Sequence, residues 1–233
     1  MLSLAVDTTT PAGSLAVLDD ERVLGMIGMS VAETHSSRLF RHLRFMLEEM
    51  RLELAQFDLY SVAAGPGSFT GLRVGLAAVM GWAEGFRKPI AAVSALEAVV
   101  AQATAPAAVL APVLDARRGQ VYGAVYERQG AELARRREEV VLAPREFLAW
   151  LAECVGNDAP VLVTPSPEVI AQGPATAGPL PSHSWLVERV SPLLASTIGR
   201  LGYQRARRGE LLNALNLDAN YVRRPDAELN WKD

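Results

Sequence analysis

The sequence predicts an α/β protein made of two lobes that share one plan. The first 30 residues alternate apolar segments with polar turns, which is typical of a meander of strands. A glycine-rich loop then joins an apolar segment to a helical pattern and a further apolar segment, an order that indicates a strand–helix–strand crossover with parallel strands. Residues 109–125 repeat the plan of residues 2–18, because each stretch has an apolar run that ends in an aspartate, a polar turn with a glycine, and a second strand. We therefore predict a first lobe over residues 1–104 and a second lobe over residues 105–233.

The first lobe is expected to combine strands with three helices. Apolar residues spaced by four, three and four over residues 34–51 indicate the first of these helices. Ser94, with Glu97 three residues later, has the pattern of a capping box at the start of the third helix. In chain order we expect strands at 2–6, 14–18, 23–29, 59–64 and 89–93, and helices at 34–51, 68–86 and 94–102.

The second lobe is expected to hold the final helix and the tail. Residues 158–181 are dense in proline and glycine, so we interpret them as mostly loop around a short strand. Pro192 is placed to bend the final helix. In chain order we expect paired strands within 109–125, a strand at 132–141, a helix from Pro144, a short strand at 161–164 and a long helix at 184–208.

Composition excludes several classes of protein. The net charge is -3, which argues against broad electrostatic capture of nucleic acid. The single cysteine, Cys154, excludes an internal disulfide framework. Because polar residues and prolines interrupt the most apolar stretch, 89–114, we predict no membrane span, and we expect a cytosolic protein. Four groups of arginines are assigned to solvated surface or helix ends, in preference to RNA contact: Arg117 and Arg118; Arg135, Arg136 and Arg137; Arg205, Arg207 and Arg208; and Arg223 and Arg224.

A glycine-rich loop at residues 65–71 is one candidate binding site. It follows a strand and opens a helix, so backbone N–H groups and the positive end of the helix would face one spot, which suits phosphate. The loop lacks the lysine of GxxxxGK[ST], and its third glycine falls one position too late for GxGxxG. The alternative is a tight turn that needs glycine for its backbone geometry. The candidate residues of the loop are Gly65, Gly67, Ser68 and Thr70.

Two aspartates at strand ends are a second candidate. Asp7 and Asp115 hold matching positions in the two lobes and together could hold a metal-bound nucleotide, because a hard cation needs paired carboxylates. The alternative is that each aspartate caps its own turn through its side chain. With the glycine-rich loop, the two aspartates would make up a vestigial nucleotide site.

The histidines do not have the spacing of a metal site. His35 and His42 are seven residues apart, which is about 10 Å along a helix and too far for one metal ion. The sequence contains neither HxxxH nor HExxH. The nearest approach to a nucleophile elbow, at residues 28–32, lacks its closing glycine. We therefore predict no catalytic residue, and no metal or cofactor held by the isolated chain.

Three stretches of sequence together resemble the TsaB (YeaZ) family. They are AVDTT at 5–9, AAGPGSFTGLRVG at 63–75 and LDARRGQVY at 114–122. Thr34-His35-Ser36 and the tail YVRRPDAELNW at 221–231 are similar to the same family. This family is related to the superfold of actin, sugar kinases and heat-shock chaperones. The resemblance therefore implies an α/β, two-lobed fold of that kind, with duplicated strand-rich lobes flanked by helices.

The resemblance also implies a function. A TsaB-type protein joins a TsaD-type catalytic subunit and a TsaE-type ATPase to make the threonylcarbamoyl modification on adenosine 37 of tRNA. TsaD-type proteins carry an HxxxH metal pair, which this sequence lacks. The resemblance thus implies a non-catalytic subunit that meets tRNA through the complex, with ATP and metal on its partners and a homodimer when alone. The alternatives are a nucleotide-dependent kinase or ATPase of the same superfold, and a metallopeptidase, which the missing metal pair disfavours.

The first two helices are the expected contact surface for a partner. Together they carry more apolar residues than one sheet can cover, and the family likeness favours an interface. The alternative is a wide apolar stripe that is wholly buried inside one lobe. The residues expected at the interface are Leu39, Leu43, Met46, Met50, Leu72, Gly75, Leu76 and Val79.

Overall fold

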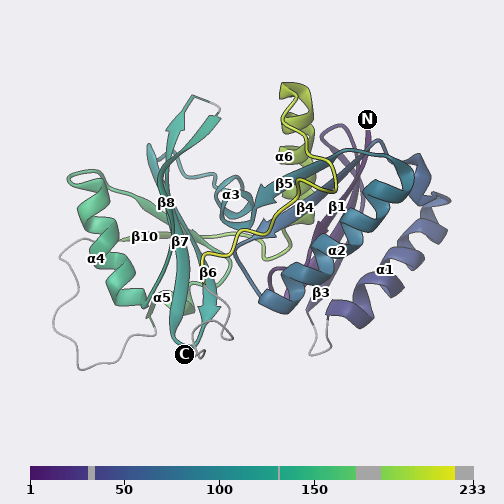
Figure 1. Ribbon diagram of the computed structural model, residues 1–233. Helices are drawn as coiled ribbons and strands as arrows, with labels where there is room; N and C mark the ends of the chain where they lie inside the picture. Colours follow the sequence, from purple (N-terminus) through teal and green to yellow (C-terminus); the bar gives the residue numbers. More distant parts are fainter. Residues whose placement is uncertain (31–34, 131, 172–184, 224–233) are drawn as a thin grey trace. The chain divides into compact units, whose positions relative to one another are not determined.

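The chain folds into two compact units. The computed structural model describes residues 1–30, 35–130, 132–171 and 185–223 (Figure 1). Contacts group Met1–Ala98 with Leu193–Tyr221 as a first unit, and Val99–Pro192 with Val222–Asp233 as a second unit. The prediction divided the chain once, at residue 104, and kept the final helix in the second lobe. In the structure the chain returns to the first unit at Leu193, so the final helix lies in the first unit.

Several features expected from the sequence lie outside the described residues. They are Thr34, the part of the predicted loop beyond residue 171, the start of the predicted final helix at Ser184, and the tail motif beyond Arg223.

The first unit is built on a five-stranded mixed sheet with the order β3-β2-β1-β4-β5. β1 pairs antiparallel with β2, and β2 with β3, whereas β1, β4 and β5 run parallel. Both the meander and the crossover predicted from the sequence are therefore confirmed. The strands are β1 (Leu2–Asp7), β2 (Ala12–Asp19), β3 (Arg22–Ser30), β4 (Leu59–Gly65) and β5 (Ile90–Ser94).

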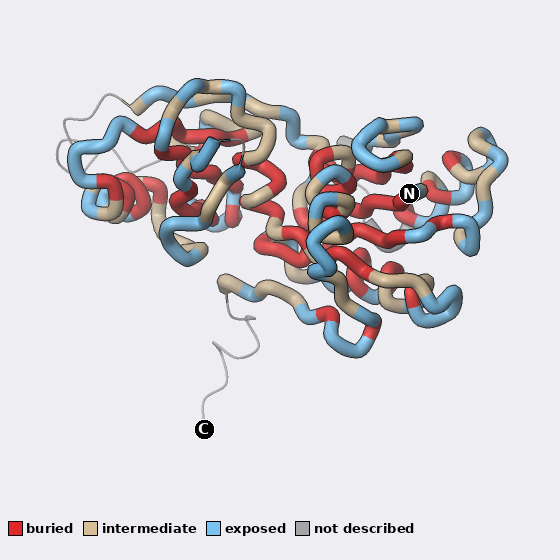
Figure 2. The backbone as a smooth tube through the Cα atoms, turned by 90° about the horizontal axis from the view of Figure 1, so that it is seen from above, coloured by how far each residue is buried: buried red, intermediate tan, exposed pale blue. Residues whose placement is uncertain are grey.

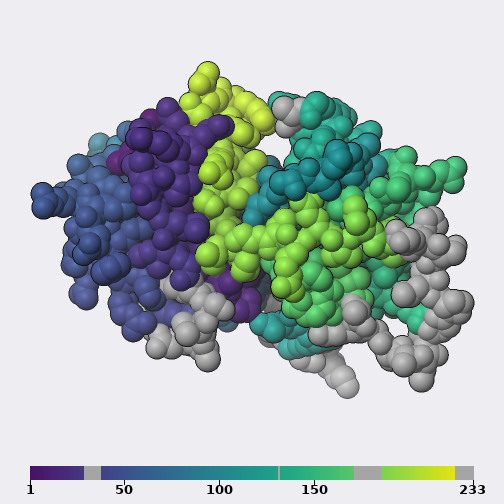
Figure 3. Space-filling view, turned by 180° about the vertical axis from the view of Figure 1, so that it is seen from behind, coloured from purple at the N-terminus to yellow at the C-terminus, as the bar shows by residue number. Residues whose placement is uncertain are grey.

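Helices cover both faces of this sheet. They are α1 (His35–Met50), the 3-10 helix η1 (Leu54–Gln56), α2 (Phe69–Phe86) and α6 (Ala195–Arg208), whereas α3 (Ala95–Val100) directly follows β5 at the boundary between the two units. α1 and α2 lie on one face and α6 on the other (Figure 1). The two faces can be followed on β3, where Gly25 touches Met50 of α1, and Gly28, three residues on, touches Leu193 just before α6. From behind, α6 lies beside the N-terminal strands (Figure 3).

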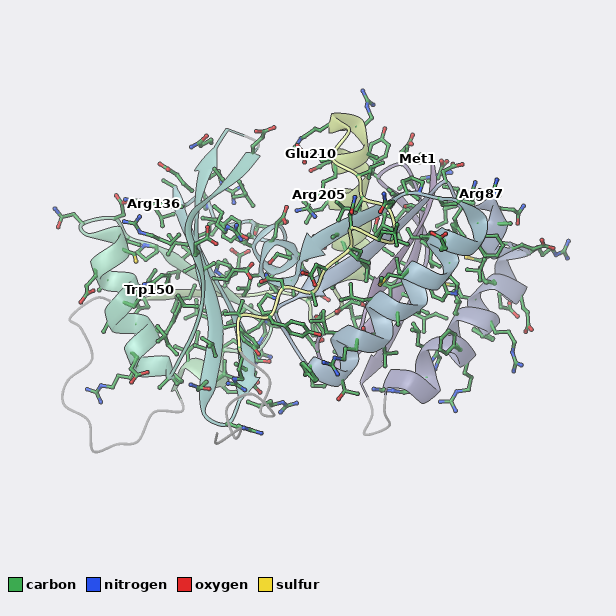
Figure 4. The ribbon with its side chains drawn as sticks, viewed as in Figure 1. Met1, Arg87, Arg136, Trp150, Arg205 and Glu210 are labelled. Atoms are coloured by element: carbon green, nitrogen blue, oxygen red, sulfur yellow. The ribbon has the colours of Figure 1, made fainter. Side chains whose placement is uncertain are left out.

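Small residues let α6 approach the sheet closely. Gly199 and Gly202 lie against side chains of β2 and β4, with no room for a Cβ at either position. Near the end of α6, Arg205 donates to the backbone oxygen of Ala92 and pairs with the carboxylate of Glu97 at 2.6 Å (Figure 4). These contacts explain why the final helix belongs to the first unit.

The second unit repeats the plan of the first. Its sheet has the order β10-β9-β6-β7-β8, and β6 pairs antiparallel with β7 and parallel with β9, as β1 does with β2 and β4. The internal repeat and the fold class predicted from the sequence are therefore confirmed. The elements are β6 (Val109–Arg117), β7 (Gln120–Gln129), β8 (Glu132–Leu142), α4 (Pro144–Val155), β9 (Val161–Thr164), α5 (Glu168–Ala171) and β10 (Leu186–Arg189).

Two predicted helices are shorter than expected. The helix predicted at 184–208 is wrong over its first part, because residues 186–189 pair with β9 as a parallel edge strand and α6 begins only at Ala195. Pro192 lies between the two elements, where it cannot disturb a helix. The helix predicted at 94–102 ends at Val100. Its N-cap is confirmed, since the Ser94 hydroxyl accepts from two backbone N–H groups of the first turn.

Each unit has its own buried core. The central strands are buried, while the outer sides of the helices and turns are exposed (Figure 2). Within the described part of the chain, no helix is both long enough and apolar enough to cross a membrane.

Candidate functional site

The turn that follows β1 carries buried polar side chains. Asp7 is fully buried, and its Oδ1 accepts hydrogen bonds from the backbone N–H and the hydroxyl of Thr9, at 2.8 and 2.6 Å. Its other oxygen, Oδ2, is buried without a hydrogen-bond partner. Burial raises the pKa of the Asp7 carboxyl from its ordinary value of 3.8 to about 6, and the two bonds from Thr9 oppose this shift. Asp7 therefore caps its own turn and keeps its proton to a higher pH than an ordinary aspartate does.

The glycine-rich loop is fastened to this turn. The Ser68 N–H donates to the Thr9 carbonyl at 2.7 Å, and the Thr8 hydroxyl donates to the Gly71 carbonyl at 2.7 Å. Ser68 also caps α2, because its hydroxyl accepts from the Gly71 N–H at 3.3 Å. Some of the N–H groups at this helix start are thus already engaged inside the protein.

Close packing explains two glycines of this region. A Cβ at Gly67 would overlap the Thr9 backbone, and a Cβ at Gly75 would overlap the Thr8 hydroxyl. The loop is therefore a close support for the turn after β1, which agrees with the tight-turn alternative.

The first glycine of the loop meets the C-terminal tail of the unit. Gly65 has a φ of +111°, which favours glycine, and a Cβ there would lie 2.6 Å from the Asn220 carbonyl oxygen. The Asn220 N–H donates to the Ala64 carbonyl at 2.7 Å. The tail therefore packs along the entry to the glycine-rich loop, whereas Thr70 is exposed on the first turn of α2.

Asp115 has the same local bond as Asp7 in a different environment. Its Oδ1 accepts from the Arg117 N–H at 2.7 Å, and its other oxygen lies 3.3 Å from the Arg117 guanidinium. Asp115 is exposed and belongs to the second unit, whereas Asp7 and the loop residues belong to the first. The alternative of a self-capped turn therefore describes both aspartates.

The tail motif supplies an arginine to the second unit. Arg223 donates to the Ala116 carbonyl at 2.8 Å and to the side chain of Gln120. It thus holds the hairpin turn between β6 and β7, where Arg117, Arg118 and Gly119 all have positive φ. This role could not be seen from the spacing of residues, because the two segments are far apart in sequence.

The side chains expected at a partner interface are core residues of the first unit. All except the half-buried Met50 are buried: Leu39, Leu43, Met46, Leu72, Gly75, Leu76 and Val79. These side chains are not available to a partner. On the same two helices Phe40, Phe45 and Phe86 are 53%, 56% and 39% exposed.

His42 is the one histidine whose side chain the structure describes, and it bonds within its own helix. Nδ1 of His42 lies 2.9 Å from the Arg38 carbonyl oxygen, within its own helix. Across residues 1–30, 35–130, 132–171 and 185–223, no three His, Cys, Asp or Glu side chains are placed to hold a metal ion.

Sequence reasoning missed one surface cluster at the start of α2. Arg73 stacks on the Phe69 ring and bonds Tyr221, which is 148 residues away in sequence. The spacing of Phe69 and Arg73 on one helix face was a readable signal, but the approach of Tyr221 was not.

The duplicated sheet order, with helices on both faces of the first sheet, defines the class of protein. It is the two-unit α/β fold of actin, sugar kinases and heat-shock chaperones. A family model for TsaD, described as tRNA N6-adenosine threonylcarbamoyltransferase, matches residues 19–161.

Individual relatives narrow the class to a family. The chain is 33% identical over 165 residues to the tRNA threonylcarbamoyladenosine biosynthesis protein TsaB of Bacillus subtilis (strain 168), across 70% of this chain and 69% of that protein. It is 34% identical over 131 residues to TsaB of Escherichia coli (strain K12), across 55% of this chain and 56% of that protein, so it spans little more than half of that relative. The structure of YeaZ from Pseudomonas aeruginosa superposes with a TM-score of 0.76 at 27% identity, across 94% of this chain and 99% of that one. The chain belongs to the TsaB (YeaZ) family, within the wider group that the TsaD family model describes.

Proposed function

We propose that this chain is a non-catalytic subunit in the synthesis of threonylcarbamoyladenosine at position 37 of tRNA. In this role it supports a TsaD-type catalytic subunit and a TsaE-type ATPase in the cytoplasm. The observation that carries the proposal is the 33% identity to the Bacillus subtilis TsaB protein, which extends over 70% of the chain.

The glycine-rich loop and Asp7 of the first unit favour a non-catalytic role. The glycine-rich loop packs directly on the turn after β1, where Gly67 and Gly75 contact Thr9 and Thr8. Asp7 is fully buried, and its Oδ1 already accepts two hydrogen bonds from Thr9. A kinase or ATPase of this superfold needs a loop open to phosphate and a carboxylate that a metal ion can reach. The nucleotide-dependent alternative is therefore less well supported, and ATP and metal are assigned to the partner subunits.

We assign the contact with a partner protein to the exposed side of α1 and α2. Phe40 packs edge-on against Trp82 and remains largely exposed. Gly81 and Gly85 lie in the middle of α2 and near its end with open space above them, although glycine weakens a helix interior by about 1 kcal/mol relative to alanine. Aromatic anchors beside small residues suit close contact with another helix. A TsaD-type protein that shares this lobe could pair here, and a second copy of this chain would compete for the same side as a homodimer.

Co-purification from the native cytosol tests the proposed function. A tagged copy of the chain is expected to recover a TsaD-type protein, identified by mass spectrometry. Phe86→Glu is expected to reduce that recovery, because it places a charge on the exposed side of α2. The matched control is Leu215→Glu, which changes an 89% exposed leucine outside α1 and α2. Absence of a TsaD-type protein from the wild-type sample would contradict the proposed function, and equal recovery with both variants would contradict the surface.

A further inference from the structure

The start of α2 carries a cluster of two aromatic rings and one arginine. Phe69, Arg73 and Tyr221, which we call the Arg73 cluster, all belong to the first unit. Cζ of Arg73 lies 3.8 Å from the centroid of the Phe69 ring, and its Nε donates to the Tyr221 hydroxyl at 3.3 Å. The two ring centroids are 5.3 Å apart. The guanidinium is therefore held on one face by Phe69 and along one edge by Tyr221.

Most of the hydrogen-bonding groups of this guanidinium have no partner among the described residues. Among the described residues, its two terminal nitrogens make no hydrogen bond and no ion pair. Arg73 is exposed, and Tyr221 is 40% exposed. The planar fork of an arginine fits the oxygens of a phosphate, and its free face can stack on a further ring. As far as the described residues are concerned, one face of the guanidinium and its two terminal nitrogens thus remain available to a ligand.

The helix does not need the charge at this position. Positive charge near the N-terminus of a helix is unfavourable, because the backbone N–H groups make that end positive. The first turn of α2 contains no acidic residue that would compensate. An uncharged side chain such as methionine would also cover the Phe69 ring, and the cation–π attraction that the charge adds at an exposed site is weak. The charge is therefore better explained by an anionic ligand than by the stability of α2.

We propose that the Arg73 cluster binds single-stranded RNA directly. The free face of the guanidinium and the exposed Tyr221 ring stack on an unpaired base, and the terminal nitrogens of Arg73 bind a neighbouring phosphate. The hydroxyl of Thr70, three residues before Arg73 on the same helix face, is placed to contact the sugar–phosphate backbone. This inference rests on the proposed function and names the contact between this chain and its tRNA substrate.

The combination of rings and arginine favours this ligand over other anions. A protein carboxylate would need only the fork of Arg73, whereas the adjacent rings suit the flat face of a base. A duplex hides the faces of its bases, so the base must be unpaired, as in a tRNA loop. The net charge of -3 argues against broad attraction of RNA, so a contact has to be local.

Binding of a fluorescent anticodon stem-loop RNA to the full chain tests the proposal. Arg73→Gln and Tyr221→Leu are each expected to weaken binding about tenfold, which is typical of losing one stacked base. The matched control, Arg87→Gln, also removes one positive charge, from an exposed arginine at the other end of α2 (Figure 4), and should weaken binding by no more than about twofold. Arg73→Lys should behave like Arg73→Gln, because lysine keeps the charge but lacks the flat face. Thermal unfolding of each variant confirms that it folds.

Several results would overturn the inference. The inference is wrong if the wild-type chain does not bind the RNA, if Arg73→Gln and Arg87→Gln weaken binding equally, or if Arg73→Lys binds as tightly as wild type. It is also wrong if a blunt duplex binds as tightly as the stem-loop, or if equimolar ATP displaces the RNA. The proposed function fails separately. If the tagged chain recovers a TsaD-type protein but the Arg73 substitutions leave RNA binding unchanged, only this inference is wrong. If the chain recovers no TsaD-type protein, the proposed function is contradicted, whatever the result with RNA.

Discussion

Replacing Asp7 by asparagine should make the first unit more stable at neutral pH. The carboxyl is fully buried, and its Oδ2 has no hydrogen-bond partner. The folded protein therefore favours the neutral form of Asp7, whose pKa is raised from 3.8 to about 6. Asparagine is neutral at every pH, has nearly the same shape, and keeps an oxygen that can accept the two bonds from Thr9.

The size and sign of the effect follow from proton linkage. Below pH 3.8 the carboxyl is protonated in both the folded and the unfolded chain, so its shift in pKa costs nothing. Between pH 3.8 and about 6 the unfolded chain releases the proton while the folded chain keeps it, so the free energy of unfolding falls as the pH rises. One pKa unit corresponds to about 1.4 kcal/mol, so the complete loss is roughly 3 kcal/mol above pH 6. Because a small part of the loss has already occurred at pH 4, the stability of Asp7→Asn relative to wild type should rise by about 2 kcal/mol from pH 4 to pH 8.

Urea unfolding at several pH values measures this difference. Pulsed hydrogen exchange of peptides that cover β1 and β4 reports on the first unit alone, since both strands lie in its sheet. Asp115→Asn is the matched control, because it removes an exposed carboxylate that makes the same local bond to its own turn. A stability difference between Asp7→Asn and wild type that is the same at pH 4 and pH 8 would refute the reasoning. It would mean that the carboxyl is hydrated, or that it is paired in solution.

Three further predictions concern packing, an ion pair and catalysis. Gly67→Ala should lower the free energy of unfolding by about 1–3 kcal/mol, because the added Cβ overlaps the Thr9 backbone. Gly81→Ala faces open space and should raise the free energy of unfolding by roughly 0.5–1 kcal/mol. If urea unfolding shows that both substitutions change the stability in the same direction, the packing is contradicted. Arg205→Ala should cost about 2 kcal/mol, and much less in a Glu97→Gln background; equal costs in the two backgrounds would show that the pair is not coupled. The purified chain should release phosphate from ATP no faster than buffer does, and steady turnover that Asp7→Asn abolishes would contradict a non-catalytic role.

Local signals predicted most of the fold. The alternation over residues 2–30 and the three–four spacing of Leu39, Leu43 and Met46 report directly on faces of strands and helices, so the elements were predicted correctly. Residues 186–189 were assigned to a helix because their state depends on pairing with β9, which is a tertiary contact. The same limit explains the final helix, since the fit of Gly199 and Gly202 against the first sheet cannot be read from spacing.

The candidate site was predictable in its residues but not in its environment. Asp7 and Asp115 have the same local bond, yet only Asp7 is buried, because tertiary packing decides burial. The apolar stripes of α1 and α2 were recognised, but a stripe does not say whether its partner is the sheet of its own lobe or another chain. Tyr221 reaches Arg73 from 148 residues away, beyond any sequence pattern.

Loss of the modified nucleoside from tRNA is the most direct test of the proposed function. Cells depleted of this chain are analysed for threonylcarbamoyladenosine by mass spectrometry of digested tRNA, with wild type or Asp7→Asn supplied in trans. We predict that the nucleoside falls to background on depletion and that both proteins restore it, because the chain supports the reaction without contributing a catalytic carboxylate. An unchanged level after depletion would contradict a role in this modification, and rescue by wild type alone, with Asp7→Asn present at equal abundance, would contradict a non-catalytic role.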